Sequence, residues 1–153
     1  MTKVKSLVDG IGNETLTEKY YDDWALNYDR TLKKWNYKAP IKAVNVMSLL
    51  KENINSNLDL ACGTGMFAAT LKKKYPNIAI DGCDISSQSL KVAKKKKLYR
   101  KLIKQSFDKK INITKKYDSV SMIGSMTYCA KPKTLFSLIF NYLKKDGIFI
   151  FTH

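Results

Sequence analysis

The stretch from Asn57 to Ala68 constrains the fold more than any other part of the chain. It begins as a short apolar run ending at Ala61, which is typical of a buried parallel strand. Gly63 and Gly65 follow, and the residues from Met66 onward have helical spacing. Glycines suit a tight turn because a Cβ would obstruct both the turn and an approaching ligand, and the first N–H groups of the next helix have no partner inside it. The stretch therefore predicts a strand, a glycine turn and a helix, with a ligand above the turn.

An acidic residue follows at the end of the next predicted strand. Residues 78–83 have the character of that strand, and Asp84 comes twenty-one positions after Gly63. A carboxylate about 20 residues beyond the glycine turn, at the tip of the neighbouring strand, accepts hydrogen bonds from the two hydroxyls of a ribose. A glycine pair alone usually marks only a turn. The two signals in this order predict a cofactor that carries a nucleoside.

The identity of the cofactor depends on a resemblance. Residues 63–68 satisfy the dinucleotide pattern G-x-G-x-x-G/A, so the glycines alone leave NAD open. Asp59-Leu-Ala-Cys-Gly-Thr-Gly65, however, resembles the first motif of class I S-adenosylmethionine (SAM)-dependent methyltransferases, with Ala61 in place of the family's first glycine. The position of Asp59 agrees with SAM, because a carboxylate there would attract the ammonium group of SAM and would repel a pyrophosphate.

The N-terminal region carries a second resemblance. Residues 21–29 are similar to the Tyr-Asp-x-Trp-Ala-x-x-Tyr-Asp pattern of the N-terminal helix in small-molecule class I methyltransferases, where this helix closes over SAM. Together with the aromatic and Ala-Pro stretch over residues 35–40, the pattern resembles the Williams–Beuren-region methyltransferase-like proteins in particular. The resemblance implies that Tyr28 is a lid residue, whereas core packing explains Trp24 better.

The resemblance implies an α/β fold with a doubly wound, Rossmann-like and mainly parallel sheet, and a cofactor above its central strands. It implies that Asp59 and the glycine turn hold the methionine part of SAM, Asp84 the ribose, and Ile85 and Phe107 the adenine. Ser106 stands where relatives commonly have an acid that meets the adenine amino group, and Asp108 lies two positions beyond. The implied cofactor-binding set is Tyr28, Asp59, Ala61, Cys62, Gly63, Thr64, Gly65, Asp84, Ile85, Ser106, Phe107 and Gly124.

The resemblance also locates the acceptor side. The loop that follows a predicted strand over residues 117–123 lies near the methyl group in relatives, which makes Ser125 and Tyr128 candidates for contact with the acceptor. No catalytic side chain is predicted, because the sulfonium of SAM already activates the methyl group and the enzyme mainly holds the acceptor in line with it.

The positive charge of the chain raises the question of nucleic acid. The formal net charge is +15, but only Arg30 and Arg100 are arginines, whereas readers of nucleic acid rely on arginine for bidentate contacts. Lys94–Lys97, with Arg100, Lys101 and Lys104, would make one basic face. A solvated surface explains this face better than contact with a polyanion does.

Size and composition indicate one domain. At 153 residues the chain divides into a flexible lead-in over 1–16 and a SAM-binding domain over 17–153. It has no apolar run of membrane-spanning length and no signal-peptide core, and its three cysteines show no metal-ligand spacing. We therefore expect a cytoplasmic protein without a membrane partner or a metal.

The predicted elements follow in the order expected for this fold. Beyond the first two strands, helices are expected after Thr15 or Thr17, from Pro40, over 66–74, after Ser86 or Ser87, and from Pro132, with strands over 102–105, 117–123 and 148–153. The chain ends on the last of these, so the final two strands of a methyltransferase sheet are missing from the prediction. An exposed apolar edge strand is unfavourable, which indicates either a truncated chain or a homo-oligomer that covers the edge.

The sequence thus predicts a SAM-dependent methyltransferase with a small-molecule acceptor. Two alternatives stay open: a non-catalytic SAM-binding or interaction module, and, less favoured, an NAD-binding oxidoreductase domain.

Overall fold

The computed structural model describes residues 10–153 and contains a five-stranded sheet. Its strands lie in the order β3-β2-β1-β4-β5, and every neighbouring pair is parallel. The chain proceeds from β1 to one side through β2 and β3, then returns to the other side for β4 and β5, which is the doubly wound arrangement. The predicted fold class is therefore confirmed. The strands are β1 (Ser56–Leu60), β2 (Ala79–Asp84), β3 (Lys101–Lys104), β4 (Tyr117–Met122) and β5 (Leu143–Phe151).

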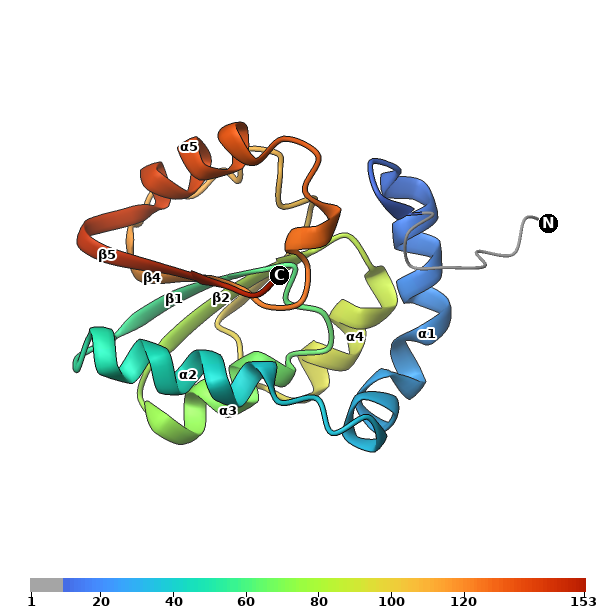
Figure 1. The fold of residues 1–153 in the computed structure, drawn as a ribbon, viewed down its shortest axis with the longest axis horizontal. Coiled ribbons are helices and arrows are strands. Elements are labelled where there is room, and N and C mark those ends of the chain that lie inside the picture. The colour runs from blue at the N-terminus through green and yellow to red at the C-terminus, as the bar shows by residue number, and fades with distance from the viewer. Residues whose placement is uncertain (1–9) are drawn as a thin grey trace.

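Helices cover both faces of this sheet, as parallel strands require. Figure 1 shows α5 on one side of the sheet and α2 and α3 on the other. A short 3-10 helix, Met126–Tyr128, follows β4. The α-helices are α1 (Glu14–Lys34), α2 (Ala39–Leu50), α3 (Met66–Lys74), α4 (Ser87–Lys95) and α5 (Pro132–Tyr142).

Two apolar clusters, one on each face, hold the layers together. Toward α5, Leu58 and Leu60 of β1 pack with Val120 and Met122 of β4. Toward α2 and α3, the buried side chains are Ala43, Val44, Met47, Ile54, Phe67, Ala68, Leu71, Ile78 and Ile80. Because successive side chains of a strand point to opposite faces, the residues that alternate with these leucines face α2 and α3, and in β1 they are polar.

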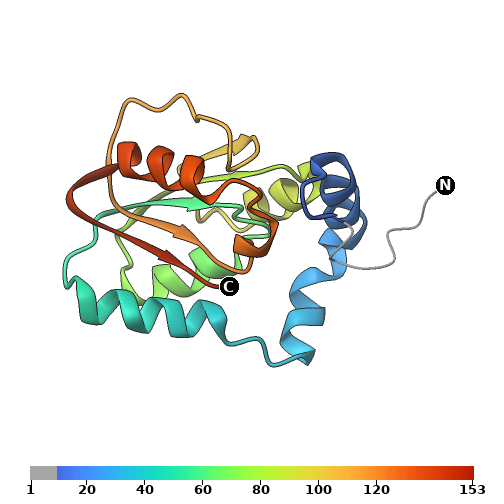
Figure 2. The same cartoon turned by 45° about the horizontal axis from the view of Figure 1, so that its top comes forward.

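Helix α1 lies outside these layers, at the end of the sheet and beside α4 (Figures 1 and 2). Ion pairs tie it to the chain there: Glu18 to Lys104 at 2.7 Å, Glu14 to Lys109 at 2.7 Å, and Asp29 to Lys96. Two members of the predicted basic face, Lys96 and Lys104, are thus engaged by helix α1, and Arg100 pairs with buried Asp81. Three of the seven residues of the predicted basic face therefore have a structural explanation.

The largest differences from the predicted element boundaries are at the starts of α1 and β5. Helix α1 begins at Glu14 and its N-cap is Asn13, whose side chain accepts from the Leu16 N–H, so the predicted threonine caps are wrong and the helix starts inside the predicted lead-in. Residues 1–9 of that lead-in lie outside the described residues. Strand β5 begins at Leu143, with an irregularity before Ile148 that includes the positive φ of Asp146. The strand thus starts five residues before the predicted strand over 148–153, and residues 146–147 interrupt it.

Candidate functional site

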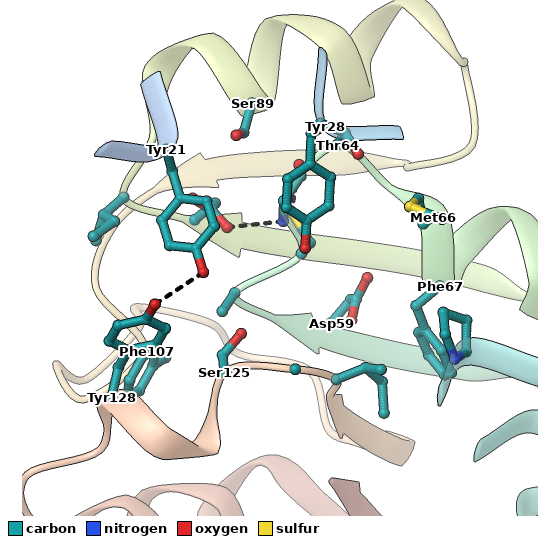
Figure 3. A pocket seen from close by; sticks show the side chains of 18 of the residues that line it. Tyr21, Tyr28, Asp59, Thr64, Met66, Phe67, Ser89, Phe107, Ser125 and Tyr128 are labelled. Atoms are coloured by element: carbon teal, nitrogen blue, oxygen red, sulfur yellow. Dashed lines mark hydrogen bonds between the residues drawn. The ribbon is translucent and has the colours of Figure 1, made fainter. Parts of the chain in front are cut away.

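A cavity opens at the carboxyl ends of β1, β2 and β4, under helix α1 (Figure 3). The space between its lining residues, with the part that is open to solvent included, is about 840 Å³. Its described lining contains two carboxylic acids and several tyrosines, and it contains no lysine, arginine or histidine. The lining residues are Thr17, Tyr21, Tyr28, Leu32, Tyr37, Pro40, Asp59, Ala61, Cys62, Gly63, Thr64, Met66, Phe67, Asp84, Ile85, Ser89, Gln105, Phe107, Ile123, Gly124, Ser125 and Tyr128.

The glycine turn forms the floor of the cavity, but its two glycines have different functions. Gly63 has a φ of +53°, and a Cβ there would meet no atom within 4 Å, so the space beside it is open for a ligand. Gly65 has a φ of +87° at the N-cap of α3 and does not line the cavity. A Cβ at Gly65 would lie 3.1 Å from the ring of Tyr99. Gly65 is therefore explained by the backbone turn and by the packing of Tyr99, and the direct ligand contact predicted for it has no support in this geometry.

Ala61 adopts a φ of +51°, a left-handed conformation that is unfavourable for any residue with a Cβ. Replacing Ala61 with glycine is expected to raise the free energy of unfolding by about 1 kcal/mol, because the strain of the left-handed backbone disappears. Urea denaturation measures the change. Ala69→Gly, inside helix α3, is the control and should lower the free energy of unfolding by about 0.5–1 kcal/mol. Equal losses in the two variants would contradict the strain at Ala61.

Asp84 lies at the tip of β2 with its side chain against the glycine turn. Its Oδ2 accepts from the Gly63 N–H at 2.8 Å and its Oδ1 accepts from the Ser86 N–H at 2.8 Å (the first of these is drawn in Figure 3). The residue is 8% exposed, and this burial raises the pKa of its carboxyl to about 6, although the N–H groups of Ser86, Gly63 and Ile85 lower it. The predicted ribose acid is thus held beside the turn, with free lone pairs on both oxygens.

Asp59 lies at the end of β1, one strand away. Its Oδ2 accepts from the Tyr99 hydroxyl at 2.7 Å and its Oδ1 accepts from the Ser121 hydroxyl at 2.8 Å. Burial raises the pKa of its carboxyl to about 7, although both hydroxyl donors lower it. Two carboxyls with raised pKa values therefore face one cavity, which is a common property of functional sites.

The residues predicted to hold the adenine divide between two cavities. Ile85 and Phe107 line the main cavity, and both also line an adjoining one. Ser106 lines only the adjoining cavity, where its hydroxyl donates to Asp108 Oδ1. The sequence reasoning missed Gln105, which does line the main cavity. The loop after β3 is irregular, so no periodicity indicated which of its side chains would face inward.

Four tyrosines also line the cavity, and Figure 3 labels Tyr21, Tyr28 and Tyr128 among them. Tyr21 and Tyr28 come from α1, Tyr37 from the segment before α2, and Tyr128 from the loop after β4. The Tyr21 hydroxyl donates to the Tyr128 hydroxyl at 3.2 Å, so the N-terminal helix meets the loop that carries Ser125. Burial raises the pKa of both Tyr21 and Tyr28, which keeps these hydroxyls neutral.

Two acids of α1 bind the loops that carry the site, and the sequence reasoning gave neither of them a role. Asp22 Oδ1 accepts from the Ser86 hydroxyl at 2.6 Å and from the Gln88 N–H at 3.0 Å, next to the loop that Asp84 organises. Asp29 accepts from the Thr64 hydroxyl in the glycine turn and from Lys96. Both acids belong to the Tyr-Asp pattern of residues 21–29. The acid that follows each tyrosine in this pattern was therefore the sequence feature that could have indicated their role.

The other predicted site residues also line the main cavity. They are Ala61, Cys62, Thr64, Gly124, Ser125 and Tyr128. Within residues 10–153, no group of three or more His, Cys, Asp or Glu side chains is arranged to hold a metal ion.

The family model described as a methyltransferase domain matches residues 58–149. A malonyl-acyl-carrier-protein O-methyltransferase 2 from Ilyobacter polytropus is 31% identical over 104 residues, covering 66% of this chain and 40% of the relative. A malonyl-acyl-carrier-protein O-methyltransferase from Bacillus cereus is 24% identical over 146 residues, covering 92% of this chain and 53% of the relative. The chain therefore spans about half the length of these curated relatives.

Among solved structures, the plantazolicin methyltransferase BpumL in complex with SAH superposes with a TM-score of 0.63. It is 20% identical, and the match covers 90% of this chain and 53% of that one. At this identity the likeness establishes the fold.

Proposed function

Because the chain belongs to the methyltransferase-domain family, we propose that its cavity binds SAM and that the protein transfers the methyl group to a small-molecule acceptor. Membership of the family confirms the predicted class, and it removes the support for an NAD-binding oxidoreductase. The observation that carries the proposal for this chain is the position of Asp84. Its carboxylate lies at the tip of β2, beside the open space over Gly63, and both of its oxygens retain lone pairs for a ribose diol.

The residues of the cavity fit SAM in charge and in the apolar surface that they offer to an adenine. Asp59 and Asp84 supply two carboxyls, and the described lining supplies no cationic side chain, which favours a ligand with an ammonium and a sulfonium over one with a pyrophosphate. Ile85 and Phe107 provide apolar surface for an adenine. We assign the methionine part to Asp59 and the turn at Gly63, which leaves the adenine for the far end of the cavity.

When bound, SAM supplies a methyl group on a positively charged sulfur, which an acceptor can attack without acid–base help. The chain's own contribution is to bind, orient and exclude water. Asp59 holds the ammonium group, Asp84 holds the ribose hydroxyls, and Tyr28 on α1 closes the cavity from above. Ser125 and Tyr128 lie on the loop after β4, where they would contact the acceptor.

The names of the two relatives extend the range of acceptors, since both include a carrier-protein-linked acceptor. The net charge of +15 would suit an acidic partner that carries such an acceptor. Contact with nucleic acid finds less support, because Lys96, Arg100 and Lys104 are engaged in ion pairs. Among residues 10–153, no helix is both long enough and apolar enough to cross a membrane. A location in the cytoplasm and a homo-oligomer stay predictions.

Calorimetric titration with S-adenosylhomocysteine (SAH) tests the proposal, with NADH as the control ligand. We expect micromolar binding of SAH and no heat from NADH, because the carboxyls of the cavity repel a pyrophosphate. Incubation with SAM and candidate acceptors, with SAH release as the readout, then separates an enzyme from a non-catalytic binding module. Absence of SAH binding, or equal affinity for NADH, would overturn the cofactor assignment.

A further inference from the structure

A continuous chain of buried polar side chains runs through the centre of the sheet to Asp59. The Ser119 hydroxyl donates to Asn57 Oδ1 at 2.7 Å, Asn57 Nδ2 donates to the Ser121 hydroxyl at 2.9 Å, and the Ser121 hydroxyl donates to Asp59 Oδ1 at 2.8 Å. All four residues are at most 1% exposed. Such polar groups are costly inside a sheet unless each has a partner, and here each has one.

The sheet register builds this chain. Asn57 lies opposite Ser119 and Asp59 lies opposite Ser121 in the β1–β4 pair. The four side chains therefore share one face of two neighbouring strands, and every donor in the chain points toward Asp59. Hydrogen bonds that run in one direction polarise each other, so the donors favour negative charge on the last acceptor.

Tyr99 provides the second donor from a different part of the molecule. It follows α4 in the chain, and its hydroxyl reaches Asp59 Oδ2 at 2.7 Å. Its ring occupies space that two glycines leave open, because a Cβ at Gly82 would lie 2.8 Å from the ring and a Cβ at Gly65 would lie 3.1 Å from it. Glycine inside a central strand is unfavourable, so a close approach by another group explains Gly82. The glycine turn thus makes room for the tyrosine that contacts Asp59.

We propose that Tyr99, Ser121, Asn57 and Ser119 are positioning residues that orient the Asp59 carboxyl toward the cavity and promote its ionised form. The proposal rests on the function proposed above, because its purpose is to bind the ammonium group of SAM or SAH. Each oxygen of Asp59 accepts one hydroxyl and retains a lone pair, so the carboxylate keeps capacity for a cationic ligand.

The ionisation of Asp59 connects the network to affinity. Burial raises the pKa of Asp59 to about 7, the two hydroxyl donors lower it, and the nearby Asp84 on β2 raises it. The other titratable groups near this arrangement are Tyr99, Cys62 and Cys83, and burial raises the pKa of all three. Affinity for a cationic ligand should therefore increase as the pH rises through about 7, and loss of a donor should move this dependence to higher pH.

The test compares two tyrosine-to-phenylalanine variants. Tyr99→Phe removes the donor to Asp59, and Tyr117→Phe removes a matched donor that contacts buried Asp81 at the same distance of 2.7 Å, outside the cavity. Two quantities are measured between pH 5.5 and 8.5: the SAH dissociation constant, and the pKa of the Asp59 carboxyl by carbon NMR in the ligand-free protein. Ser121→Ala removes the other donor to Asp59, and it replaces Tyr99→Phe in the test if that variant does not fold.

In Tyr99→Phe we expect the pKa of Asp59 to rise by about one unit, since a hydrogen bond to a charged group contributes about that much. SAH affinity should then fall about fivefold to tenfold at pH 6.5 and approach that of the wild type at pH 8.5. Tyr117→Phe should leave both quantities unchanged. If neither Tyr99→Phe nor Ser121→Ala changes the pKa of Asp59 or the pH dependence of SAH affinity, the positioning role proposed for these donors is wrong.

A wild-type protein that fails to bind SAH at every pH would overturn the proposed function. The carboxyl titration in the ligand-free protein would still decide whether these donors promote the ionised form of Asp59, so the two failures are distinguishable.

Discussion

Replacing Asp84 with alanine is expected to weaken SAH binding by at least about a hundredfold, since two or more hydrogen bonds to one carboxylate are lost and each contributes about 1.5–3 kcal/mol. The two ribose hydroxyls would lose their acceptor. The Gly63 and Ser86 N–H groups, now 2.8 Å from the carboxyl oxygens, would also lose theirs. The substitution therefore removes both a ligand contact and the bond that holds the glycine turn against β2.

Calorimetry on Asp84→Ala and on Asp118→Ala separates these effects from a general loss of stability. Asp118 is also 8% exposed and also accepts several hydrogen bonds, from the Ser56 hydroxyl, the Asn55 N–H and Lys144, but it lies at the opposite end of the sheet. Asp118→Ala should lower the free energy of unfolding and leave the SAH dissociation constant within about twofold of the wild type. If both variants lost affinity equally, Asp84 would have no specific role in binding.

Asp59→Asn is expected to make the protein more stable at pH 8 and less able to bind SAH. The pKa of Asp59 is about 7 in the folded protein and its ordinary value is 3.8, so the folded state retains a proton that the unfolded chain releases. The free energy of unfolding therefore falls as the pH rises from about 4 to about 7 and is constant above that, with a total loss of a few kcal/mol. Asparagine has no charge to bury, so the variant should regain about 2 kcal/mol at pH 8 and much less at pH 4.5.

Urea denaturation of Asp59→Asn at pH 4.5 and pH 8 measures this change. Asp81→Asn is the control of opposite sign: burial disfavours the Asp81 carboxylate, but hydrogen bonds from Arg100 and Tyr117 hold its pKa below the ordinary value. Its ionised form therefore stabilises the fold above the unfolded pKa, and that stability is lost as the pH falls through the folded pKa. Asp81→Asn should accordingly destabilise the protein at pH 8. A loss of stability in Asp59→Asn at pH 8 would refute the burial penalty assigned to its carboxyl.

Sequence patterns were sufficient for the order of elements and for the centre of the site. Gly63 and Asp84 meet because parallel neighbouring strands bring their carboxyl ends to the same edge, and the register that pairs Leu60 with Cys83 follows that rule. The helix over Met66–Lys74 was predicted with the same bounds that it has in the structure. The glycine turn that ends at Gly65 precedes its first residue, and Pro76 prevents its continuation. These features depend on local chemistry and on one general property of parallel sheets.

The contacts around those central residues depended on packing between distant parts of the chain. Tyr99 and Ser121 are 40 and 62 positions after the carboxyl that they contact, and Asp22 is 64 positions before the serine that it accepts from. The alternation of polar residues at Asn57 and Asp59, and at Ser119 and Ser121, together with Gly82 in a central strand, was the visible sign of an internal polar network. It could not be interpreted without knowing which strands are neighbours.

The local sequence therefore determined which residues turn the chain, begin its helices and end its strands, because propensity and capping act over a few positions. Only the tertiary structure decided which acids are buried, which donors reach them and which side of each loop faces the cavity. Those properties depend on the removal of water and on sheet register, and both arise only when segments far apart in the sequence pack together.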